Sequence, residues 1–269
     1  MNRRSFLVGA TCACTARVPG LASLATLADH AAGLAPALGT LGLQRTAAAG
    51  IETRWQSAER GCSLTGAASQ AAVAGRTTSQ SGDPRLDTAL IAEVKQIDAF
   101  FGIQPAYQYL DDGVRPNAYA NDTNTRPGTQ GTISIGLTLL GLEFQEPWGG
   151  AAVAGIAAHE GAHIFQFTTR YYAACRQLSL MGNGTDREME LHADFLAGFY
   201  FAGTGRTAKS LDVFGRSLFK KGDKGYNNPW HHGTPQERLT AMATGYAVWR
   251  RTDDLITAAN EGLAHVRPT

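Results

Sequence analysis

The chain has 269 residues, with 24 Lys and Arg against 23 Asp and Glu and a hydrophobic fraction of 43%. This length allows one good-sized domain plus a leader, and the composition is that of a globular protein and not of a disordered chain. A formal net charge of +1 excludes the strongly basic surface that is typical of proteins binding nucleic acid or anionic membranes. We therefore expect no nucleic-acid partner.

The N-terminal residues are typical of an export signal. Arg3 and Arg4 precede a weakly apolar stretch, and residues 35–37 read Ala-Pro-Ala, which has the form of a signal cleavage site. The segment resembles a bacterial twin-arginine signal, although an ordinary secretory leader or an uncleaved tail fits the same residues. We expect residues 1–37 to be a signal peptide and the protein to be exported to the periplasm or the medium.

Residues 38–84 are rich in Ala, Gly, Ser and Thr and lack a clear periodicity, which predicts a linker or pro-region that is partly disordered. Cys62 in this segment and Cys175 further on remain after removal of the leader. In an oxidising compartment they are a disulfide candidate, and two unrelated buried thiols are the alternative. No segment after the leader has the ~20 uninterrupted apolar residues of a membrane span, so we expect no transmembrane helix in the mature chain.

The remaining residues, 85–269, predict one α+β domain. A helix is expected from Leu86 to Phe101, because apolar residues recur there at helical spacing and Gly102 follows. Short extended segments come next, and we expect them to form a small antiparallel sheet. These segments are residues 103–110, 117–120 and 131–136. Helical patterns then dominate, at residues 137–144, 150–171, 186–202, 208–221 and 235–255.

A metal-binding pattern lies in the second of these later helices. His159 and His163 are four residues apart, so their side chains project from one face and can bind one cation together. Glu160 lies about 100° further round the helix, where a general base can reach a water molecule on that cation. An HExxH string arises by chance in a chain of this length about one time in a hundred, so the motif needs independent support.

The support comes from the next helix. Glu190 and Asp194 share one face of an otherwise apolar helix, and two carboxylates that face the interior need a partner such as a zinc ion with its histidines. We expect Glu190 to be the third zinc ligand and Asp194 to fix the tautomer of a ligand histidine, preferably His159. The alternative is a solvated helix face with ordinary ion pairs. His192 points elsewhere by the same periodicity and is not expected to bind the metal.

The two motifs together resemble a known family. Residues 159–163 (HEGAH) and 190–194 (ELHAD) resemble the HExxH and ExxAD pair of gluzincin metallopeptidases, in particular bacterial neutral zinc metallopeptidases and minigluzincins. Residues 117–120 and 132–136 resemble the strand pair upstream of the active helix, whose edge strand binds an extended peptide in that family. Asn117, Ala118 and Tyr119 are then the expected substrate-binding residues, and an inner strand is the alternative.

A downstream segment also agrees with the family. His232-Gly233-Thr234-Pro235, followed by Arg238, resembles its H-x-x-P segment, whose histidine stabilises the oxyanion. His231 is the rival for this role, and Tyr171 and Tyr172 are further candidates.

The resemblance as a whole implies a zincin-like α+β fold and an exported zinc-dependent peptidase with Glu160 as general base. Its expected partner is a peptide or protein substrate, whose identity the sequence leaves open, as it does the oligomeric state. Two alternatives are a zinc-containing binding or chaperone-like protein without peptidase turnover, and a non-enzymatic exported domain in which the motifs are coincidental.

Overall fold

The computed structural model describes residues 61–63, 77–114, 116–222, 228 and 230–268. The chain divides into two units, Met1–Thr53 and Arg54–Thr269, and all described residues belong to the second. The predicted signal peptide (residues 1–37) and most of the predicted linker therefore lie outside the described residues. None of the helices in the described ranges combines the length and the apolar character that a membrane crossing requires.

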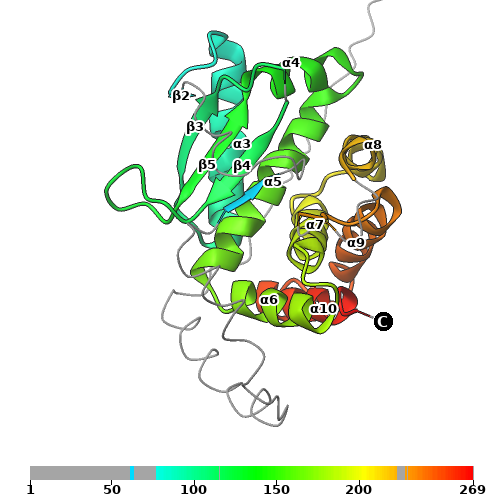
Figure 1. Cartoon of the computed structure of the whole chain (residues 1–269). Helices are drawn as coiled ribbons and strands as arrows, with labels where there is room; N and C mark the ends of the chain where they lie inside the picture. Colours follow the sequence, from blue (N-terminus) through cyan, green and yellow to red (C-terminus); the bar gives the residue numbers. More distant parts are fainter. Residues whose placement is uncertain (1–60, 64–76, 115, 223–227, 229, 269) are drawn as a thin grey trace, which may run out of the picture. The chain divides into compact units, whose positions relative to one another are not determined.

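The described unit is α+β, and its strands form one mixed sheet (Figure 1). The strand order is β1-β4-β5-β3-β2. The strands are β1 (Gly61–Ser63), β2 (Thr77–Thr78), β3 (Ala106–Leu110), β4 (Ala118–Asn121) and β5 (Thr132–Gly136). The neighbours β3 and β5 are parallel, and the other pairs are antiparallel.

The prediction of an antiparallel sheet is therefore wrong for the β3–β5 pair. The chain reverses between β3 and β4 and again between β4 and β5, which makes β3 and β5 run in the same direction. Because β5 lies between β4 and β3 in the sheet, the two parallel strands pair directly. Local alternation of residues predicts strands but carries no information on this order.

The helix before β3 forms as predicted. Helix α3 (Pro84–Phe101) begins after Asp83, whose carboxylate accepts hydrogen bonds from the backbone N–H groups of Arg85 and Leu86. It ends at Gly102, which adopts the left-handed conformation with φ 65°. Its apolar face packs against α5 (Gly149–Thr168).

Seven more helices follow in the described ranges, and two of them were not predicted. The predicted helix of residues 150–171 corresponds to α5, which ends at Thr168, and α6 begins only at its last residue, Tyr171. The predicted helix of residues 235–255 corresponds to α9, which ends at Val248, and α10 begins only at Leu255. The helices besides α5 are α4 (Leu137–Gln145), α6 (Tyr171–Met181), α7 (Arg187–Gly203), α8 (Ala208–Lys221), α9 (Pro235–Val248) and α10 (Leu255–His265).

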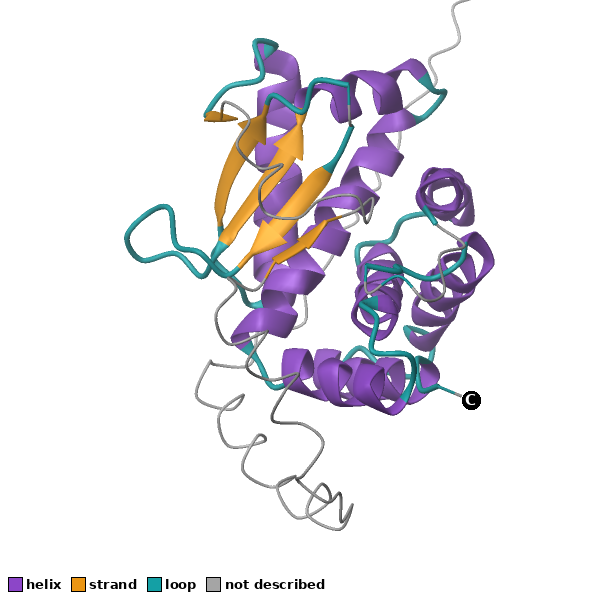
Figure 2. Cartoon of the chain, in the orientation of Figure 1, coloured by secondary structure: helices purple, strands orange, loops and turns teal. Residues whose placement is uncertain are grey.

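Helix α5 lies between the sheet and the C-terminal helices (Figure 2). It packs against β4 and β5 and also against α6, α7 and α8. Nearly all its residues are buried, which fits its apolar composition on all sides. The HEGAH motif at residues 159–163 therefore lies in the interior of the described unit.

Helices α7 and α9 meet at two glycines. A Cβ atom at Gly198 would come within 2.0 Å of the Met242 carbonyl oxygen, and one at Gly245 within 1.8 Å of the Phe195 carbonyl oxygen. Only glycine fits such a close approach of two backbones. Ion pairs of Arg187 with Glu237 and of Asp194 with Arg238 join α7 to the first turn of α9 as well.

Candidate metal centre

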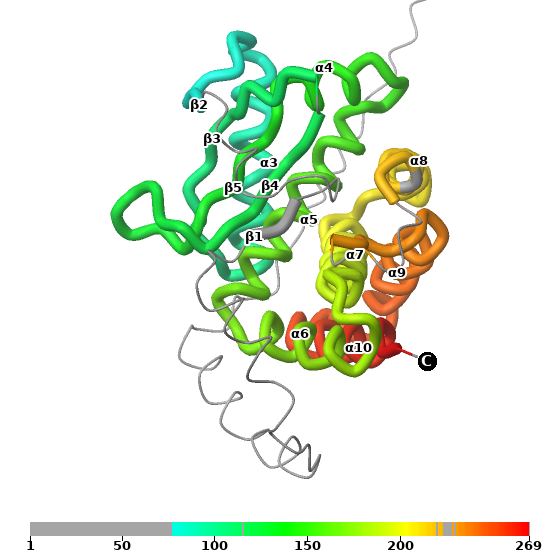
Figure 3. The backbone as a smooth tube through the Cα atoms, viewed as in Figure 1, coloured from blue at the N-terminus to red at the C-terminus, as the bar shows by residue number. Residues whose placement is uncertain are grey.

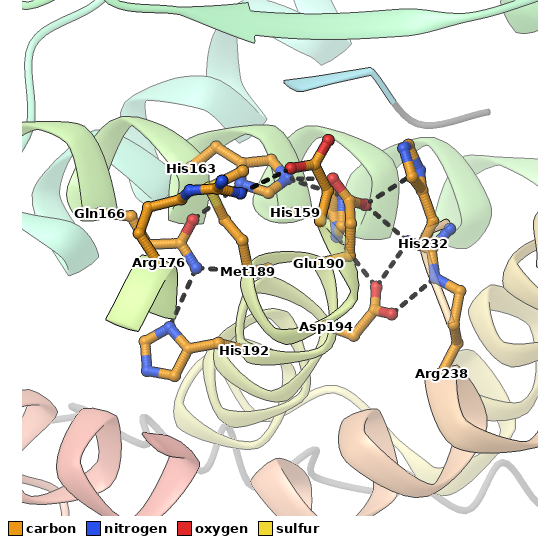
Figure 4. A network of polar contacts seen from close by, with 11 residues as sticks. His159, His163, Gln166, Arg176, Met189, Glu190, His192, Asp194, His232 and Arg238 are labelled. Atoms are coloured by element: carbon orange, nitrogen blue, oxygen red, sulfur yellow. Dashed lines mark hydrogen bonds and ion pairs between the residues drawn. The ribbon is translucent and has the colours of Figure 1, made fainter. Parts of the chain in front are cut away.

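Three buried side chains from α5 and α7 converge on one point (Figure 4). His159 and His163 come from successive turns of α5, and Glu190 comes from the first turn of α7. One ligand atom from each lies within 4.8 Å of the other two, and all three side chains are fully buried. These residues could therefore hold a metal ion.

The distances within the triad fit one small cation. The two histidine Nε2 atoms are 3.1 Å apart. Glu190 Oε2 lies 3.3 Å from His159 Nε2, and Glu190 Oε1 lies 3.3 Å from His163 Nε2. Ligands about 2.0–2.2 Å from a tetrahedral zinc ion are roughly 3.3–3.5 Å from one another. The donor atoms thus have the spacing that such an ion needs.

The outer nitrogen of each histidine faces an oxygen acceptor. Nδ1 of His159 lies 2.9 Å from Asp194 Oδ1, and Nδ1 of His163 lies 2.8 Å from Gln166 Oε1. The Asp194 carboxylate can only accept, so Nδ1 of His159 carries a hydrogen, and Nε2 of this ring points toward Glu190. Lone pairs and a carboxylate at these distances require a positive charge among them.

The ionisation of the triad agrees with this requirement. Burial alone would raise the pKa of Glu190, but His232, His163 and His159 hold it well below its usual range. Burial likewise lowers the pKa of His159, and the carboxylates of Asp194 and Glu190 overcome this effect and raise it to about 9. A metal ion would take the place of a proton on His159.

Asp194 is held by a buried arginine. Its Oδ2 accepts a hydrogen bond from Arg238 Nε at 2.7 Å, and its Oδ1 accepts one from Arg238 Nη2 at 2.9 Å. Nη2 also lies 3.6 Å from Glu190 Oε2. Although burial opposes ionisation, Arg238 and His159 lower the pKa of Asp194. The arginine thus balances the charge of Asp194 and also lies near Glu190.

Glu160 lies next to the triad on α5. Its side chain is fully buried, and neither carboxylate oxygen has a hydrogen-bond partner among the described residues. Burial raises its pKa to about 8. A buried carboxylate without partners is costly, and such groups concentrate at functional sites.

The loop before α9 brings a further histidine to the site. Thr234 and Glu237 form a capping box at the start of this helix, with Pro235 as its first residue. His232 precedes this cap and is buried, with Nδ1 3.5 Å from Glu190 Oε2. Its rival, His231, is also buried. Of the two, His232 lies beside the triad (Figure 4).

His192 and Tyr171 are engaged away from the triad. The His192 ring stacks on Tyr171 with centroids 5.5 Å apart, and burial lowers the pKa of His192 to about 4. The Tyr171 hydroxyl donates to the Ile256 carbonyl at 3.2 Å, so this candidate for the oxyanion points to α10. Tyr172 follows Tyr171 in the first turn of α6.

The strand predicted to bind substrate is not an edge strand. Asn117 directly precedes β4, which contains Ala118 and Tyr119 and lies next to β5 (Figure 3). The other neighbour of β4 in the sheet is β1. Tyr119 pairs with Ser63 of β1, which comes from the predicted linker. The inner-strand alternative is therefore correct for the described structure. A three-residue strand such as β1 is too short to show a periodic signal in the sequence.

The predicted disulfide is not formed in the structure. Cys175 is a free thiol, buried in α6, and burial raises its pKa. Its predicted partner, Cys62, lies on β1 and pairs with Ala120 of β4. Helix α6, in contrast, packs against α5, α7 and α10. The alternative of unrelated thiols is the one that fits Cys175.

Two residues of the site were not assigned roles in the sequence interpretation. Arg238 and Gln166 contact Asp194 and His163 from other turns or other helices, and only their complete burial distinguishes them from surface polar residues. The sequence carries no local signal for that burial. Comparisons with protein-family models, with curated proteins and with solved structures give no match to this chain.

Proposed function

We propose that the protein is a zinc-dependent peptidase in which His159, His163 and Glu190 hold the ion. The observation that carries the proposal is the convergence of these three ligands from α5 and α7. Two imidazoles and one carboxylate are typical of catalytic zinc sites, which keep the fourth position open, whereas structural sites fill all four positions and favour cysteine. The resemblance of residues 159–163 and 190–194 to gluzincin motifs supports the same function.

The donor set favours zinc over other common cations. Calcium and magnesium prefer oxygen ligands in sets of six or more, whereas zinc accepts mixed nitrogen and oxygen ligands at tetrahedral spacing. The separations of 3.1 Å and 3.3 Å between the donor atoms are those of a compact tetrahedral site.

A bound zinc ion would polarise the scissile carbonyl and lower the pKa of a water molecule toward about 7. Glu160 would then take a proton from this water and pass it to the leaving amine. Its carboxylate has no competing hydrogen bond among the described residues, so both oxygens are available for the proton. Burial raises the pKa of this group in the metal-free site, which makes it a stronger base than an exposed glutamate.

His232 would stabilise the oxyanion that develops on the substrate carbonyl. Its ring lies beside Glu190, so it is close to where the reacting carbonyl would bind. A preorganised donor of this kind contributes about 3–4 kcal/mol to the stabilisation of a transition state. Arg238 is a weaker candidate because Asp194 occupies its Nε and Nη2 groups.

The setting proposed for this activity follows the sequence interpretation. A mixed sheet followed by the HExxH helix and the glutamate helix supports a zincin-like arrangement for residues 85–269. Residues 1–37 would export the protein, residues 38–84 would be a linker or pro-region, and the substrate would be a peptide or protein.

The test compares the full chain with its Glu160→Gln variant on a diverse peptide library, with and without chelator, and reads the products by mass spectrometry. The wild type should cleave peptides in a chelator-sensitive manner. Glu160→Gln should retain stoichiometric zinc but lose hydrolysis, because it keeps the ligands and removes the base. Unchanged turnover in this variant would refute the assignment.

A metal analysis provides the matched control. Glu190→Ala should lose zinc, because it removes a ligand. Glu188→Ala should keep it, because Glu188 lies on the same helix but pairs with Arg187. Equal zinc content in the two variants would show that α7 does not supply the third ligand.

One observation favours an alternative, a zinc-containing binding protein without peptidase turnover. The triad and Glu160 are fully buried, which restricts the access of a substrate. In that case the wild type would retain zinc and yet release no peptide products, and Glu160→Gln would behave like the wild type in every assay.

A further inference from the structure

Gln166 is a buried side chain that the proposed mechanism does not use. It lies on α5 three residues after His163 and is fully buried. Its amide contacts three groups from two helices: His163 Nδ1 at 2.8 Å, the Met189 carbonyl oxygen at 2.9 Å and His192 Nδ1 at 3.0 Å. Figure 4 shows this amide between His163 and His192. A buried amide with so many partners restricts how each of them can carry its hydrogen.

The direction of these hydrogen bonds is set first by the Met189 carbonyl. A carbonyl oxygen only accepts, so the amide nitrogen of Gln166 has to face it. The second hydrogen of this NH2 group then points to His192 Nδ1. The amide oxygen is left facing His163 Nδ1, which has to donate.

The hydrogen bond of His192 with α10, at the other end of this network, gives the same direction independently. His192 Nε2 lies 3.0 Å from the Ala259 carbonyl oxygen of α10, so Nε2 carries the hydrogen. Nδ1 of a neutral His192 is then an acceptor, as the Gln166 amide requires. Two backbone carbonyls on α7 and α10 thus impose one consistent pattern that ends at His163.

We propose that Gln166 is a positioning residue that fixes His163 in the Nδ1–H tautomer, and that His192 fixes the orientation of the Gln166 amide. This inference rests on the proposed function only in taking His163 as a metal ligand. With Nδ1 protonated, the His163 Nε2 lone pair faces the other two ligands, 3.1 Å from His159 Nε2 and 3.3 Å from Glu190 Oε1. The ligand set is therefore oriented before an ion binds.

Gln166 orients His163 through its Nδ1 atom, as Asp194 orients His159. Unlike Asp194, Gln166 is neutral. A carboxylate partner makes an imidazole more basic and adds negative charge to the site. An amide orients the ring without that charge, so Gln166 adds no further carboxylate to those of Glu190, Asp194 and Glu160. Fewer negative charges near an ion leave it a stronger Lewis acid.

The direct test measures the tautomers in the full-length protein. Long-range correlations between ¹⁵N and ring protons distinguish Nδ1–H from Nε2–H in each histidine, and chelator-treated protein is used so that the result does not depend on metal. His163 should carry its hydrogen on Nδ1 and His192 on Nε2. An Nε2–H tautomer for His163, or an Nδ1–H tautomer for His192, would overturn the inference whether or not the protein cleaves peptides.

Two variants test the consequence for metal binding. Gln166→Met keeps the length of the side chain and removes every hydrogen bond of the amide, so the zinc affinity should fall about 10–100-fold and the visible spectrum of the cobalt(II) form should change. Thr168→Val is the matched control on α5, because it removes only the hydrogen bonds of a hydroxyl to the Ile164 and Phe165 carbonyls and should leave both readouts unchanged. Equal zinc affinity in the two variants would contradict the proposed role.

The outcomes separate this inference from the peptidase proposal. Predicted tautomers, together with a fall in zinc affinity in Gln166→Met, support the positioning role even if no peptide is hydrolysed. Peptide hydrolysis with the opposite tautomers supports the peptidase and refutes the role of Gln166. If Gln166→Met fails to fold, the tautomers of the wild type still decide.

Discussion

The candidate site has a helix side and a sheet side, and the two are built differently. On the helix side, side chains of α5, α7 and α9 form a fully buried network around the triad. On the sheet side, β4 packs against α5, and the three residues of β1 pair with β4 through the backbone. The helix side depends on specific side chains, whereas the described contact of β1 with β4 is backbone pairing, whose hydrogen bonds are worth about 1 kcal/mol each in net terms.

This difference suggests a division of labour. A preorganised network that is costly to disturb suits the binding of an ion and the placement of a base. A short strand held by few hydrogen bonds opens at a low free-energy cost. The predictions below disturb the helix side first and the sheet side last, in order of decreasing effect.

The largest effect should follow loss of the carboxylate that pairs with Arg238. Asp194→Ala leaves a fully buried guanidinium without its bidentate partner, and an uncompensated buried charge costs about 3–5 kcal/mol. The free energy of unfolding, measured with urea, should fall by this amount.

The control is an exposed ion pair on α8. Asp212 and Arg216 are 63% and 64% exposed, so Asp212→Ala should change the free energy of unfolding by less than about 1 kcal/mol. The double variant Asp194→Ala/Arg238→Met should recover part of the loss, because it removes the unpaired charge. If Asp194→Ala and Asp212→Ala lower the free energy of unfolding by the same amount, the buried network of the helix side does not stabilise the fold as proposed.

The second prediction concerns pH. Burial lowers the pKa of His192 to about 4, whereas an unfolded histidine has a pKa of about 6.5. Between these values the unfolded chain binds a proton that the folded chain does not, so stability falls as the pH is lowered from about 6.5 to 4. The expected contribution is on the order of 3 kcal/mol.

The measurement compares the wild type with His192→Phe in chelator between pH 7 and 4.5. Phenylalanine keeps the stacking on Tyr171 but does not titrate, and the contributions of all other groups cancel in the difference. As the pH falls, the free energy of unfolding should therefore decrease more in the wild type than in the variant. Parallel curves would mean that His192 titrates normally.

The third prediction tests the contact that joins α7 to α9. Gly245→Ala would place a Cβ atom within 1.8 Å of the Phe195 carbonyl oxygen, and the two backbones would have to separate. We expect a loss of about 1–3 kcal/mol in the free energy of unfolding, together with weaker metal binding because α9 carries Arg238. Gly141→Ala on α4 meets no atom within 4 Å and should instead stabilise by about 0.4–1 kcal/mol.

The same contrast explains what could be predicted from the sequence. The i, i+4 spacings of His159 with His163 and of Glu190 with Asp194 are local, so they indicated the helix faces of the site before any fold was known. Gln166 and Arg238 act across helices, and their spacing in the sequence carries no such signal. The break between α5 and α6, at residues 169–170, contains neither glycine nor proline, so no turn residue indicated where α6 begins.

The sheet was less predictable for the same reason. Alternation and turn residues indicated β3, β4 and β5 as strands, but not that β5 would insert between the other two. The pairing of β1 with β4 joins segments more than 50 residues apart in the sequence. A strand lies at the edge of a sheet only if no other strand pairs with its outer side. The pairing of β1, which is distant in the sequence, therefore made the prediction of β4 as an edge strand wrong.

The smallest effect should come from the sheet side. An extended peptide that pairs with β4 has to displace β1, so a weaker β1 should raise kcat/KM. Successive N–H groups of a strand point to opposite sides, so one of the two variants Cys62→Pro and Ser63→Pro removes a donor to β4. Loss of one hydrogen bond worth about 1 kcal/mol corresponds to an increase of about fivefold.

The other proline variant and Cys62→Ala are the matched controls, since neither removes a backbone donor that faces β4. Both should keep the kcat/KM of the wild type in the peptide assay. If neither proline variant raises kcat/KM while one of them lowers the free energy of unfolding, β1 is a permanent strand of the sheet. Substrate would then have to reach the triad without pairing with β4, and the two sides of the site would be equally fixed.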